Sequence, residues 1–387
     1  MSDKEAVEQK FKQAAGLISS AGMIPFAITD TLMEIIRFYL DEDDADFINA
    51  SFDRSKSLSY DQLKAKTGFS DERIRTKTES LAKKGIIFNQ PNTQGVIVYK
   101  LLPLILVGTF EYTFMTRLPE GKEREPLGKI ARLYHQLLTE LRDNMQRSYD
   151  SLLPIFEHQP PVDRTVPVRT TEDGRTINIV VDKSIKAEDT VLPAQTVEEI
   201  IAKFDDIAVG YCFCRNYNKV LGHDCEIKAP NEVCFTFGKS ARHTVAQGFA
   251  RAVSKAEALA IMKQAEEGGL VHKAFHNGSN INKEENSICN CCKDCCDTFT
   301  LWRNGAVPMV NSTNYLSVID ADACTGCGIC VERCPVDAIS LNSDSVAVRV
   351  EQYCIGCGIC ARFCPADAIS LKEGARRVYV PPPRLRV

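Results

Sequence analysis

The sequence predicts an α+β protein of several domains, and three observations lead to this fold class. The chain has 387 residues, which is enough for two or three domains of ordinary size. Its first 211 residues contain no cysteine, whereas all 17 cysteines lie between Cys212 and Cys364. An eighteen-residue segment that begins at Cys324 also recurs thirty residues later. We therefore expect four parts: a thiol-free domain at 1–118, a helical connector with an extended linker at 119–195, a cysteine-rich α/β domain at 196–312 and a repeat-containing domain at 313–387.

The composition excludes several classes of protein. An odd number of cysteines cannot pair completely in disulfides, and the first ten residues lack the apolar core of a secretory signal. A formal net charge of −4 and a pI near 6.0 argue against a generally basic nucleic-acid-binding protein. The longest strongly apolar stretch, 101–107, is far shorter than the roughly 20 residues that span a bilayer. We expect a cytoplasmic protein whose thiolates bind metal.

Helix-forming patterns come first in the N-terminal domain, and strand-forming patterns come last. The predicted helices begin near residues that can act as N-caps, among them Asp30, Ser59 and Ser70. A further helix is predicted at 43–51. The last helix ends at Gly85, and the two predicted strands lie at 86–88 and 96–101. Helix, turn, helix and a two-stranded wing in this order resemble a winged helix-turn-helix domain.

Three cations share a narrow arc of the helix predicted at 70–84, because steps of four and eleven residues return close to whole turns. They are Arg73, Lys77 and Lys84. Residues 60–100 carry eight Lys/Arg against four Asp/Glu, a balance that suits contacts with DNA phosphates. The alternative is a solvated helix face on a domain that binds another protein, since this fold does not itself imply DNA binding.

The segment between the two halves is expected to act as a connector. A helix is predicted from Pro126 to Leu153, and its apolar stripe would join domains or form a dimer. Residues 159–195 are rich in proline, aspartate and threonine, with one strand predicted at 176–181. In the cysteine-rich domain, Ser254 and Glu257 form a capping box that predicts a helix through Glu267.

The repeat carries the clearest chemistry of the sequence. Thirteen of its eighteen positions are identical in the two copies, which begin at Cys324 and Cys354. Both copies have the spacing C-x2-C-x2-C-x3-C-P, which is the signature of bacterial two-cluster ferredoxins. Glycines between the first three cysteines permit the tight turns with which thiolates wrap a cube of iron and sulfide. Tetrahedral zinc sites use other spacings, so zinc is disfavoured here.

The resemblance to bacterial two-cluster ferredoxins covers about sixty residues and implies the ligands of two [4Fe–4S] clusters. In that family, the fourth thiolate of each cluster comes from the other copy of the repeat. The first cluster would be held by Cys324, Cys327, Cys330 and Cys364. The second cluster would be held by Cys354, Cys357, Cys360 and Cys334. Such crossing makes the repeat one folding unit that carries electrons.

Nine further cysteines precede the repeat, which is more than one additional cube needs. In an extended segment neighbouring side chains point to opposite faces, so the doublets 291–292 and 295–296 are not expected to give both thiolates to one cluster. Two nearby sites, one bridged unusual cluster, or one site with free reactive thiols would fit. We interpret the nine as at least one further iron–sulfur centre, with structural zinc or redox-active disulfides as alternatives. They are Cys212, Cys214, Cys225, Cys234, Cys289, Cys291, Cys292, Cys295 and Cys296.

Two resemblances concern these nine cysteines. The doublets resemble those of the cysteine-rich subunits of heterodisulfide reductases, although no glycine follows either doublet here. The whole chain is similar to a family of multi-cluster ferredoxin-type proteins of anaerobic bacteria, whose final triple cysteine is here Cys295-Cys296-Asp297. The segments that carry this resemblance are 211–215, 222–225, 233–238, 269–272 and 288–292. It implies a winged-helix start, a cysteine-rich middle and a C-terminal ferredoxin domain.

Other side chains are candidates to act beside the central thiols. Arg215 would offset the negative charge of a thiolate cluster or form an ordinary salt bridge. Each of four histidines in this region could be a ligand or a proton donor near the central thiols. A lone histidine is, however, more often a surface or capping residue than a ligand. The four are His223, His243, His272 and His276, of which the last two have the i, i+4 spacing of one helix face. The sequence contains neither G-x-G-x-x-G nor a P-loop, so flavin or NAD would have to come from a partner.

Taken together, these patterns predict an electron-transfer protein that relays electrons between two [4Fe–4S] clusters and an additional cysteine-ligated centre. Two alternatives stay open: a redox-sensing regulator that binds DNA, and a reductase subunit whose site lies at the central cysteines. Residues 313–373 carry eight Asp/Glu against four Lys/Arg, so we expect a basic docking surface on the redox partner. A homo-oligomer is also compatible with the sequence.

Overall fold

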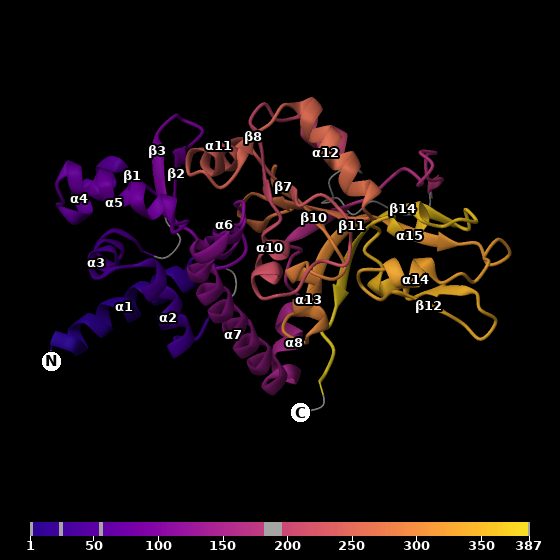
Figure 1. The fold of residues 1–387 in the computed structure, drawn as a ribbon, viewed down its shortest axis with the longest axis horizontal. Helices are drawn as coiled ribbons and strands as arrows, with labels where there is room; N and C mark the ends of the chain where they lie inside the picture. Colours follow the sequence, from indigo (N-terminus) through magenta and orange to yellow (C-terminus); the bar gives the residue numbers. More distant parts are fainter. Residues whose placement is uncertain (1–2, 23–25, 54–56, 182–195, 386–387) are drawn as a thin grey trace.

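A mixed sheet of nine strands joins the middle of the chain to its C-terminal part (Figure 1). The computed structural model describes residues 3–22, 26–53, 57–181 and 196–385. The strand order in this sheet is β5-β14-β11-β4-β9-β10-β7-β6-β8. The strands are β4 (Asp163–Val166), β5 (Ile179–Val181), β6 (Ile207–Tyr211), β7 (Glu232–Phe237), β8 (Arg251–Ala252), β9 (Val271–His276), β10 (Glu285–Cys291), β11 (Met309–Ile319) and β14 (Ile369–Val380).

The N-terminal region lies at the left of Figure 1 and contains helices and a small three-stranded sheet in the order β1-β3-β2. Its elements are α1 (Asp3–Ser20), α2 (Asp30–Tyr39), α3 (Glu42–Ser51), β1 (Leu58–Ser59), α4 (Tyr60–Thr67), α5 (Asp71–Lys83), β2 (Ile87–Pro91) and β3 (Ile97–Leu101). Ser59 and Ser70 cap α4 and α5 as predicted, because each side chain accepts a hydrogen bond from the first helical turn. The N-cap of α2 is Thr29, so the prediction of Asp30 was one residue off.

The helix predicted from Pro126 to Leu153 is in fact two helices. They are α7 (Glu125–Arg147) and α8 (Tyr149–Glu157), and they follow α6 (Thr109–Phe114). The break lies at Ser148, whose φ of −110° and ψ of 21° leave the helical range. The apolar stripe of α7 packs against α2 and is buried in the N-terminal core, as Ile130 and Leu137 show. This stripe is therefore covered within the chain.

The extended linker expected at 159–195 contributes two strands to the large sheet. Strand β4 lies between β11, with which it is parallel, and β9, with which it is antiparallel. All of its residues are buried, so the linker prediction was wrong for 163–166. The strand predicted at 176–181 is shorter, since β5 covers Ile179–Val181, and residues 182–195 lie outside the described part of the chain.

Strand β11 crosses the expected boundary between residues 312 and 313, so the repeat shares its sheet with the cysteine-rich region. The short helices α14 (Ile329–Arg333) and α15 (Ile359–Arg362) and the pair β12 (Ile339–Leu341) and β13 (Ala347–Arg349) complete the repeat. Its elements form the right side of Figure 1. The remaining helices are α9 (Val197–Ala202), α10 (Phe213–Val220), α11 (Gly238–Ala246), α12 (Lys255–Glu267) and α13 (Asp297–Arg303). Helix α12 has the predicted bounds, and Ser254 is its cap.

Candidate metal centres

The two copies of the repeat bring their cysteines together in two small hollows. Each hollow has a volume of about 20 Å³ and is lined by three cysteines of one copy and the last cysteine of the other. The outer hollow is lined by Cys324, Cys327, Cys330 and Cys364. The inner hollow is lined by Cys334, Cys354, Cys357 and Cys360. These are the two quartets that the ferredoxin resemblance implies.

Glycines let the backbone form the turns that carry these thiols. Gly326 and Gly356 have φ values of 69° and 64°, in the left-handed region that favours glycine. A Cβ atom at Gly356 would lie 2.1 Å from the Tyr315 carbonyl oxygen, and one at Gly326 would lie 2.4 Å from that of Ser345. Any other residue at either position would therefore displace the ligand turn.

The two hollows differ in their surroundings. In the outer hollow Cys327 is exposed and Cys324 is half-buried. In the inner hollow all four thiols are buried, and the carbonyl of Cys357 accepts a hydrogen bond of 3.0 Å from the Val168 amide. The outer hollow therefore lies near the surface, whereas the inner hollow lies against the body of the protein.

The donor chemistry of both hollows fits iron–sulfur clusters. Burial raises the pKa of the Cys334, Cys357 and Cys360 thiols above the ordinary value. Thiols with such pKa values are neutral at pH 7 unless positive charge is supplied, and bound iron supplies it. Four convergent thiols in a small, largely apolar hollow are the environment that a [4Fe–4S] cluster requires.

The nine central cysteines separate into two neighbouring groups. The first, here called the three-thiol site, consists of Cys225, Cys292 and Cys295 together with Asp294. The second, here called the six-thiol wall, lines a cavity of about 180 Å³ and consists of Cys212, Cys214, Cys234, Cys289, Cys291 and Cys296. Each doublet is divided between the two groups. The prediction that neighbouring thiols serve different sites agrees with this arrangement.

The ligand atoms of the three-thiol site all lie within 4.8 Å of one another. The Asp294 carboxylate is 3.5 Å from the Cys225 sulfur and 3.3 Å from the Cys295 sulfur. Its Oδ2 also accepts a hydrogen bond of 2.7 Å from the Glu226 amide. Hydrogen bonds from Cys225 and Cys295 hold the pKa of Cys292 well below its usual range. Asp294 was not predicted from the sequence, because a single aspartate between cysteines carries no signal of its own.

A buried cation accompanies the three-thiol site. Arg215 is buried, and its guanidinium donates a hydrogen bond of 2.6 Å to the Pro230 carbonyl. Burial by itself disfavours the charge of Arg215, but the nearby thiolates of Cys212 and Cys292 more than offset this, so its pKa is raised. Arg215 was predicted either to offset thiolate charge or to form an ordinary salt bridge, and its placement fits the first role.

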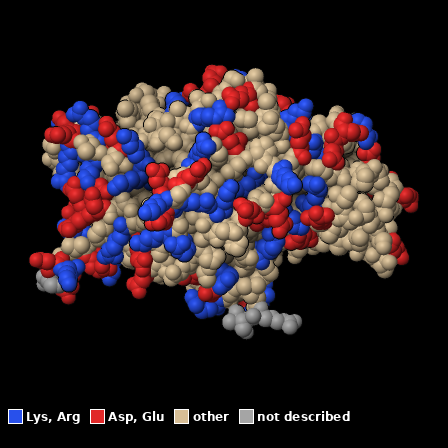
Figure 2. All heavy atoms as spheres, in the orientation of Figure 1, with Lys and Arg blue, Asp and Glu red and all other residues tan. Residues whose placement is uncertain are grey.

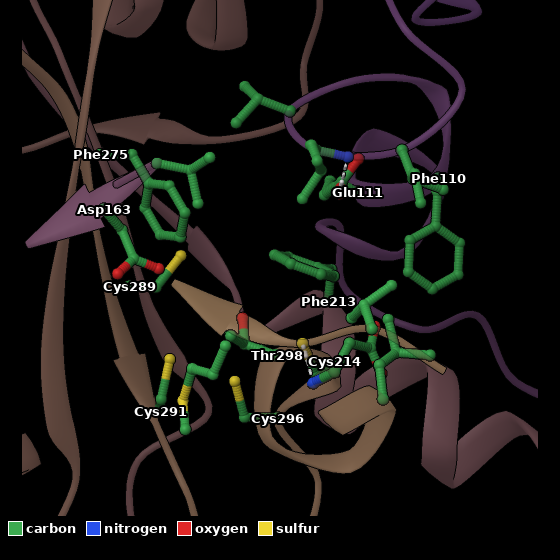
Figure 3. Close-up of a pocket in the computed structure, with 18 of the residues that line it drawn as sticks. Phe110, Glu111, Asp163, Phe213, Cys214, Phe275, Cys289, Cys291, Cys296 and Thr298 are labelled. Carbon is green, nitrogen blue, oxygen red and sulfur yellow. Dashed lines mark hydrogen bonds between the residues drawn. The ribbon is translucent and has the colours of Figure 1, made fainter. Parts of the chain in front are cut away.

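Cysteine sulfurs and apolar side chains both line the cavity (Figure 3). Cys289, Cys291 and Cys296 lie together on one side, and Phe110 and Phe213 lie on the opposite side. Part of the apolar lining comes from α6, α10 and the segment before α6, which belong to parts of the chain far apart in sequence. The central thiols thus face a chamber that the N-terminal region helps to close.

A second buried cation lies beside the six-thiol wall. The Lys273 ammonium is fully buried and forms an ion pair of 2.7 Å with Asp163. Burial disfavours this charge, and Asp163, Cys291 and Cys296 offset the effect, so the pKa of Lys273 is raised. Asp163 and Lys273 come from the adjacent strands β4 and β9. Neither residue was predicted from the sequence, because only the pairing of these strands brings them together.

Besides Asp163, two carboxylic acids line the cavity. Burial raises the pKa of Glu111, whose carboxylate accepts hydrogen bonds from the amides of Leu106 at 2.7 Å and Gly108 at 2.9 Å. Burial likewise raises the pKa of Asp297 well above its usual value. The Asp297 amide donates a hydrogen bond to the Cys214 sulfur at 3.4 Å. Asp297 therefore lies beside the six-thiol wall.

Residues 317–371 match the family model described as a 4Fe-4S dicluster domain. This segment is a 4Fe-4S dicluster domain. The chain is also similar to a protein of Methanosarcina thermophila named "Probable ferredoxin", with 59% identity over 29 residues. The match covers 8% of this chain and 50% of that protein, so the chain spans about half the length of this relative. Residues 317–371 are therefore the ferredoxin-type, iron–sulfur part of the chain.

Contacts join the dicluster domain directly to the central thiols. Lys293, which lies between Cys292 and Asp294, donates a hydrogen bond of 2.8 Å to the Glu332 carbonyl. Its ammonium is also 3.2 Å from the Asp337 carboxylate. The central cysteine segment is thereby fixed to the part of the dicluster domain that carries Cys334.

The four candidate histidines, all of them among the described residues, lie away from the candidate metal centres. His272 and His276 are on strand β9, so the helical spacing predicted for them was wrong. His272 contacts Glu266 at 3.2 Å, and His276 contacts the Lys283 carbonyl at 2.7 Å. His243 is buried, which lowers its pKa to about 4, and His223 is exposed. Within the described residues, none of the four lines the cavity, the two hollows or the three-thiol site.

The three cations of α5 are engaged in ion pairs with α3. Lys77 and Lys84 contact the buried Asp44 carboxylate at 2.7 Å and 2.6 Å. Arg73 pairs with Asp43. These contacts hold α5 against α3 and neutralise the charge that DNA phosphates would meet. Among the described helices, none is both long enough and apolar enough to cross a membrane.

Proposed function

We propose that the protein relays electrons between the dicluster domain and an additional iron–sulfur centre held at the six-thiol wall. In this proposal the outer quartet holds one [4Fe–4S] cluster and the inner quartet holds the other. When bound, such clusters supply one-electron redox centres. The supporting observation is that Cys291 and Cys296 belong to the same packed core as Cys334, Cys357 and Cys360.

The burial of the two quartets supports a direction for the relay. Cys327 is exposed, so the outer cluster is the one that an external redox protein can approach. The inner cluster lies between it and the central thiols, because its Cys334 is near the contacts of Lys293. In Figure 2 the right end, where the dicluster domain lies, is largely uncharged with a few Asp and Glu side chains at its edge. The excess of Asp and Glu over Lys and Arg in residues 313–373 supports a partner with a basic docking surface. Electrons would pass from this partner through the outer and then the inner cluster.

Protein side chains tune the central centre in this proposal. The Lys273 ammonium, 2.7 Å from Asp163 and beside Cys291 and Cys296, compensates negative charge when an electron arrives. The apolar side chains that line the cavity exclude water from the cysteine sulfurs. Both effects come from residues outside the ligand set, which is how proteins commonly set the potential of a bound cluster.

The relay is tested by removing one cluster ligand at a time. Cys357→Ser should stop reduction of the central centre by an external low-potential ferredoxin, while the outer cluster is still reduced. Rapid-freeze electron paramagnetic resonance of anaerobically purified protein measures both signals. Iron that is lost only from the inner site shows that the variant has folded. Central reduction at the wild-type rate in Cys357→Ser would contradict the relay.

The cavity favours a second candidate, a reductase site at the central thiols. Its volume of about 180 Å³ is much larger than the hollows of about 20 Å³ that accommodate the dicluster quartets. Side chains such as Phe110 and Leu138 cannot bind metal, so space next to them suits a small apolar molecule. Benzene, a probe that apolar cavities of this size accept, should then perturb the central signal and leave the dicluster signals unchanged. Unchanged spectra at saturating benzene would argue against this function.

We also propose that the N-terminal region is a winged helix that binds a partner protein. The order of α3, α4, α5 and the pair β2–β3 supports this assignment. Because Lys77 and Lys84 are engaged with Asp44, a protein surface suits this face better than DNA does. Cross-linking of the anaerobic full chain in cell extract, compared with the variant Arg75→Glu at an exposed position of α5, measures whether this region contacts a partner protein.

A further inference from the structure

We propose that Cys225, Cys292, Asp294 and Cys295 bind a single zinc ion, at a site separate from the iron–sulfur centre of the six-thiol wall. This site is not required by the electron relay and does not depend on it. The zinc would be structural and not catalytic, because four protein ligands fill its coordination sphere and leave no position for a substrate. The proposal divides the 17 cysteines into eight, six and three.

The spacing of the ligand atoms fits one ion. Zinc binds thiolate sulfur at about 2.3 Å and carboxylate oxygen at about 2.0–2.2 Å, so tetrahedral ligand atoms lie about 3.5–4 Å apart. The Asp294 oxygens lie 3.5 Å from the Cys225 sulfur and 3.3 Å from the Cys295 sulfur. All four ligand atoms lie within 4.8 Å of one another. Small adjustments would therefore bring them to one metal.

The dicluster domain provides an internal comparison for this spacing. A cube of four irons places each cysteine on a different iron, so its ligands stand farther apart than those of a single ion. In the described residues, which include every cysteine, only the three-thiol site has three or more ligand atoms that are all within 4.8 Å. Neither dicluster quartet and no trio of the six-thiol wall meets this criterion. The three-thiol site therefore has the dimensions of a single-ion site.

The surroundings of the site hold its ligands in place. The Glu226 amide donates a hydrogen bond of 2.7 Å to Asp294, and the Cys295 amide donates one of 3.4 Å to the Cys292 sulfur. Zinc with three thiolates and one carboxylate would carry a net charge of −2. The buried guanidinium of Arg215, whose charge is supported by Cys292, offsets part of this charge. Such outer contacts are typical of metal sites in proteins.

The position of the site gives the ion a structural role. Cys225 belongs to the loop after α10, whereas Cys292 and Cys295 belong to the segment after β10. One ion would therefore tie two segments that are far apart in sequence. Cys291 and Cys296 flank this segment and belong to the six-thiol wall, so the zinc site would also fix the wall.

Metal analysis of the anaerobically purified full chain tests the proposal. We expect one zinc per chain in addition to the iron. Asp294→Asn keeps an oxygen that accepts the Glu226 hydrogen bond but removes the charge, so zinc affinity in chelator competition should fall at least about tenfold. Iron and sulfide content should not change. Asp224→Asn alters an exposed carboxylate next to Cys225 and is the matched control, which should behave like the wild type.

Two results would overturn the zinc site. One is wild-type protein without stoichiometric zinc, and the other is loss of iron and sulfide in Asp294→Asn with zinc unchanged. Cobalt uptake during growth provides a measurement that does not rely on removing a ligand. Thiolate-to-cobalt absorption should appear in the wild type and should shift in Asp294→Asn, whereas an identical spectrum in both would exclude Asp294 as a ligand. A failed relay would alter iron signals instead, so the two proposals fail separately.

Discussion

The dicluster domain and the central region both bring cysteine thiols together into candidate metal sites, but they do so by different structural means. In the dicluster domain, eight cysteines in two nearly identical segments form two hollows of equal size. In the central region, nine cysteines from α10, β7, β10 and the adjoining loops form two unequal groups. Each central group has a buried cation beside it, Arg215 or Lys273. Local turns thus build the first kind of site, and tertiary packing with charge compensation builds the second.

The largest expected effect comes from removing one ligand of each dicluster quartet. Cys324→Ser should disturb only the cluster that also involves Cys364, and Cys354→Ser only the cluster that involves Cys334. Each variant should lose about four irons or convert one cluster, because a cube needs its four ligands. Iron analysis and electron paramagnetic resonance measure this. If Cys324→Ser removed only the electron paramagnetic resonance signal of the central centre, Cys324 would not be a ligand of the dicluster domain.

The second largest effect is expected at Lys273. Lys273→Met would leave Asp163 buried without its cation, which costs about 3–5 kcal/mol of stability. Anaerobic thermal unfolding measures this cost. The central centre should also become harder to reduce, since a positive charge near Cys291 and Cys296 is lost. Lys255→Met, which removes an exposed ion pair with Asp205, is the control and should cost about 0–1 kcal/mol. Equal effects of the two variants would show that Lys273 does not compensate negative charge in the central region.

The same contrast explains what the sequence could predict. The quartets of the dicluster domain follow from one short repeat, because glycine turns such as that at Gly326 are local. The division of each doublet also follows from a local rule, the alternation of side chains in extended backbone. Asp163 and Lys273 could not be found, since they meet only when β4 and β9 pair. β4 itself was missed because it is a four-residue strand in a segment rich in proline, aspartate and threonine.

A smaller effect is expected within the dicluster domain, where two equivalent glycines have different neighbours. Gly328 and Gly358 have φ values of 79° and 77°, so alanine at either costs about 1 kcal/mol for the left-handed backbone. A Cβ at Gly358 would also lie 2.5 Å from the Val168 carbonyl oxygen, whereas a Cβ at Gly328 meets nothing within 4 Å. Gly358→Ala should therefore lower the unfolding temperature more than Gly328→Ala. Equal melting temperatures would mean that the inner half of the repeat does not pack tightly against the body.

The smallest effect is expected at the thiol-free end, where charge is compensated without metal. Arg73 is partly exposed and already paired with Asp43, so Arg73→Gln should change the free energy of unfolding by less than about 1 kcal/mol. Because Lys77 and Lys84 are engaged with Asp44, the anaerobic protein should not retain DNA in a gel-shift assay at low salt. Retention that weakens with salt and with Arg73→Gln would instead favour a DNA-binding regulator. The basic helix would then function in binding, and the thiol-rich half would serve as its sensor.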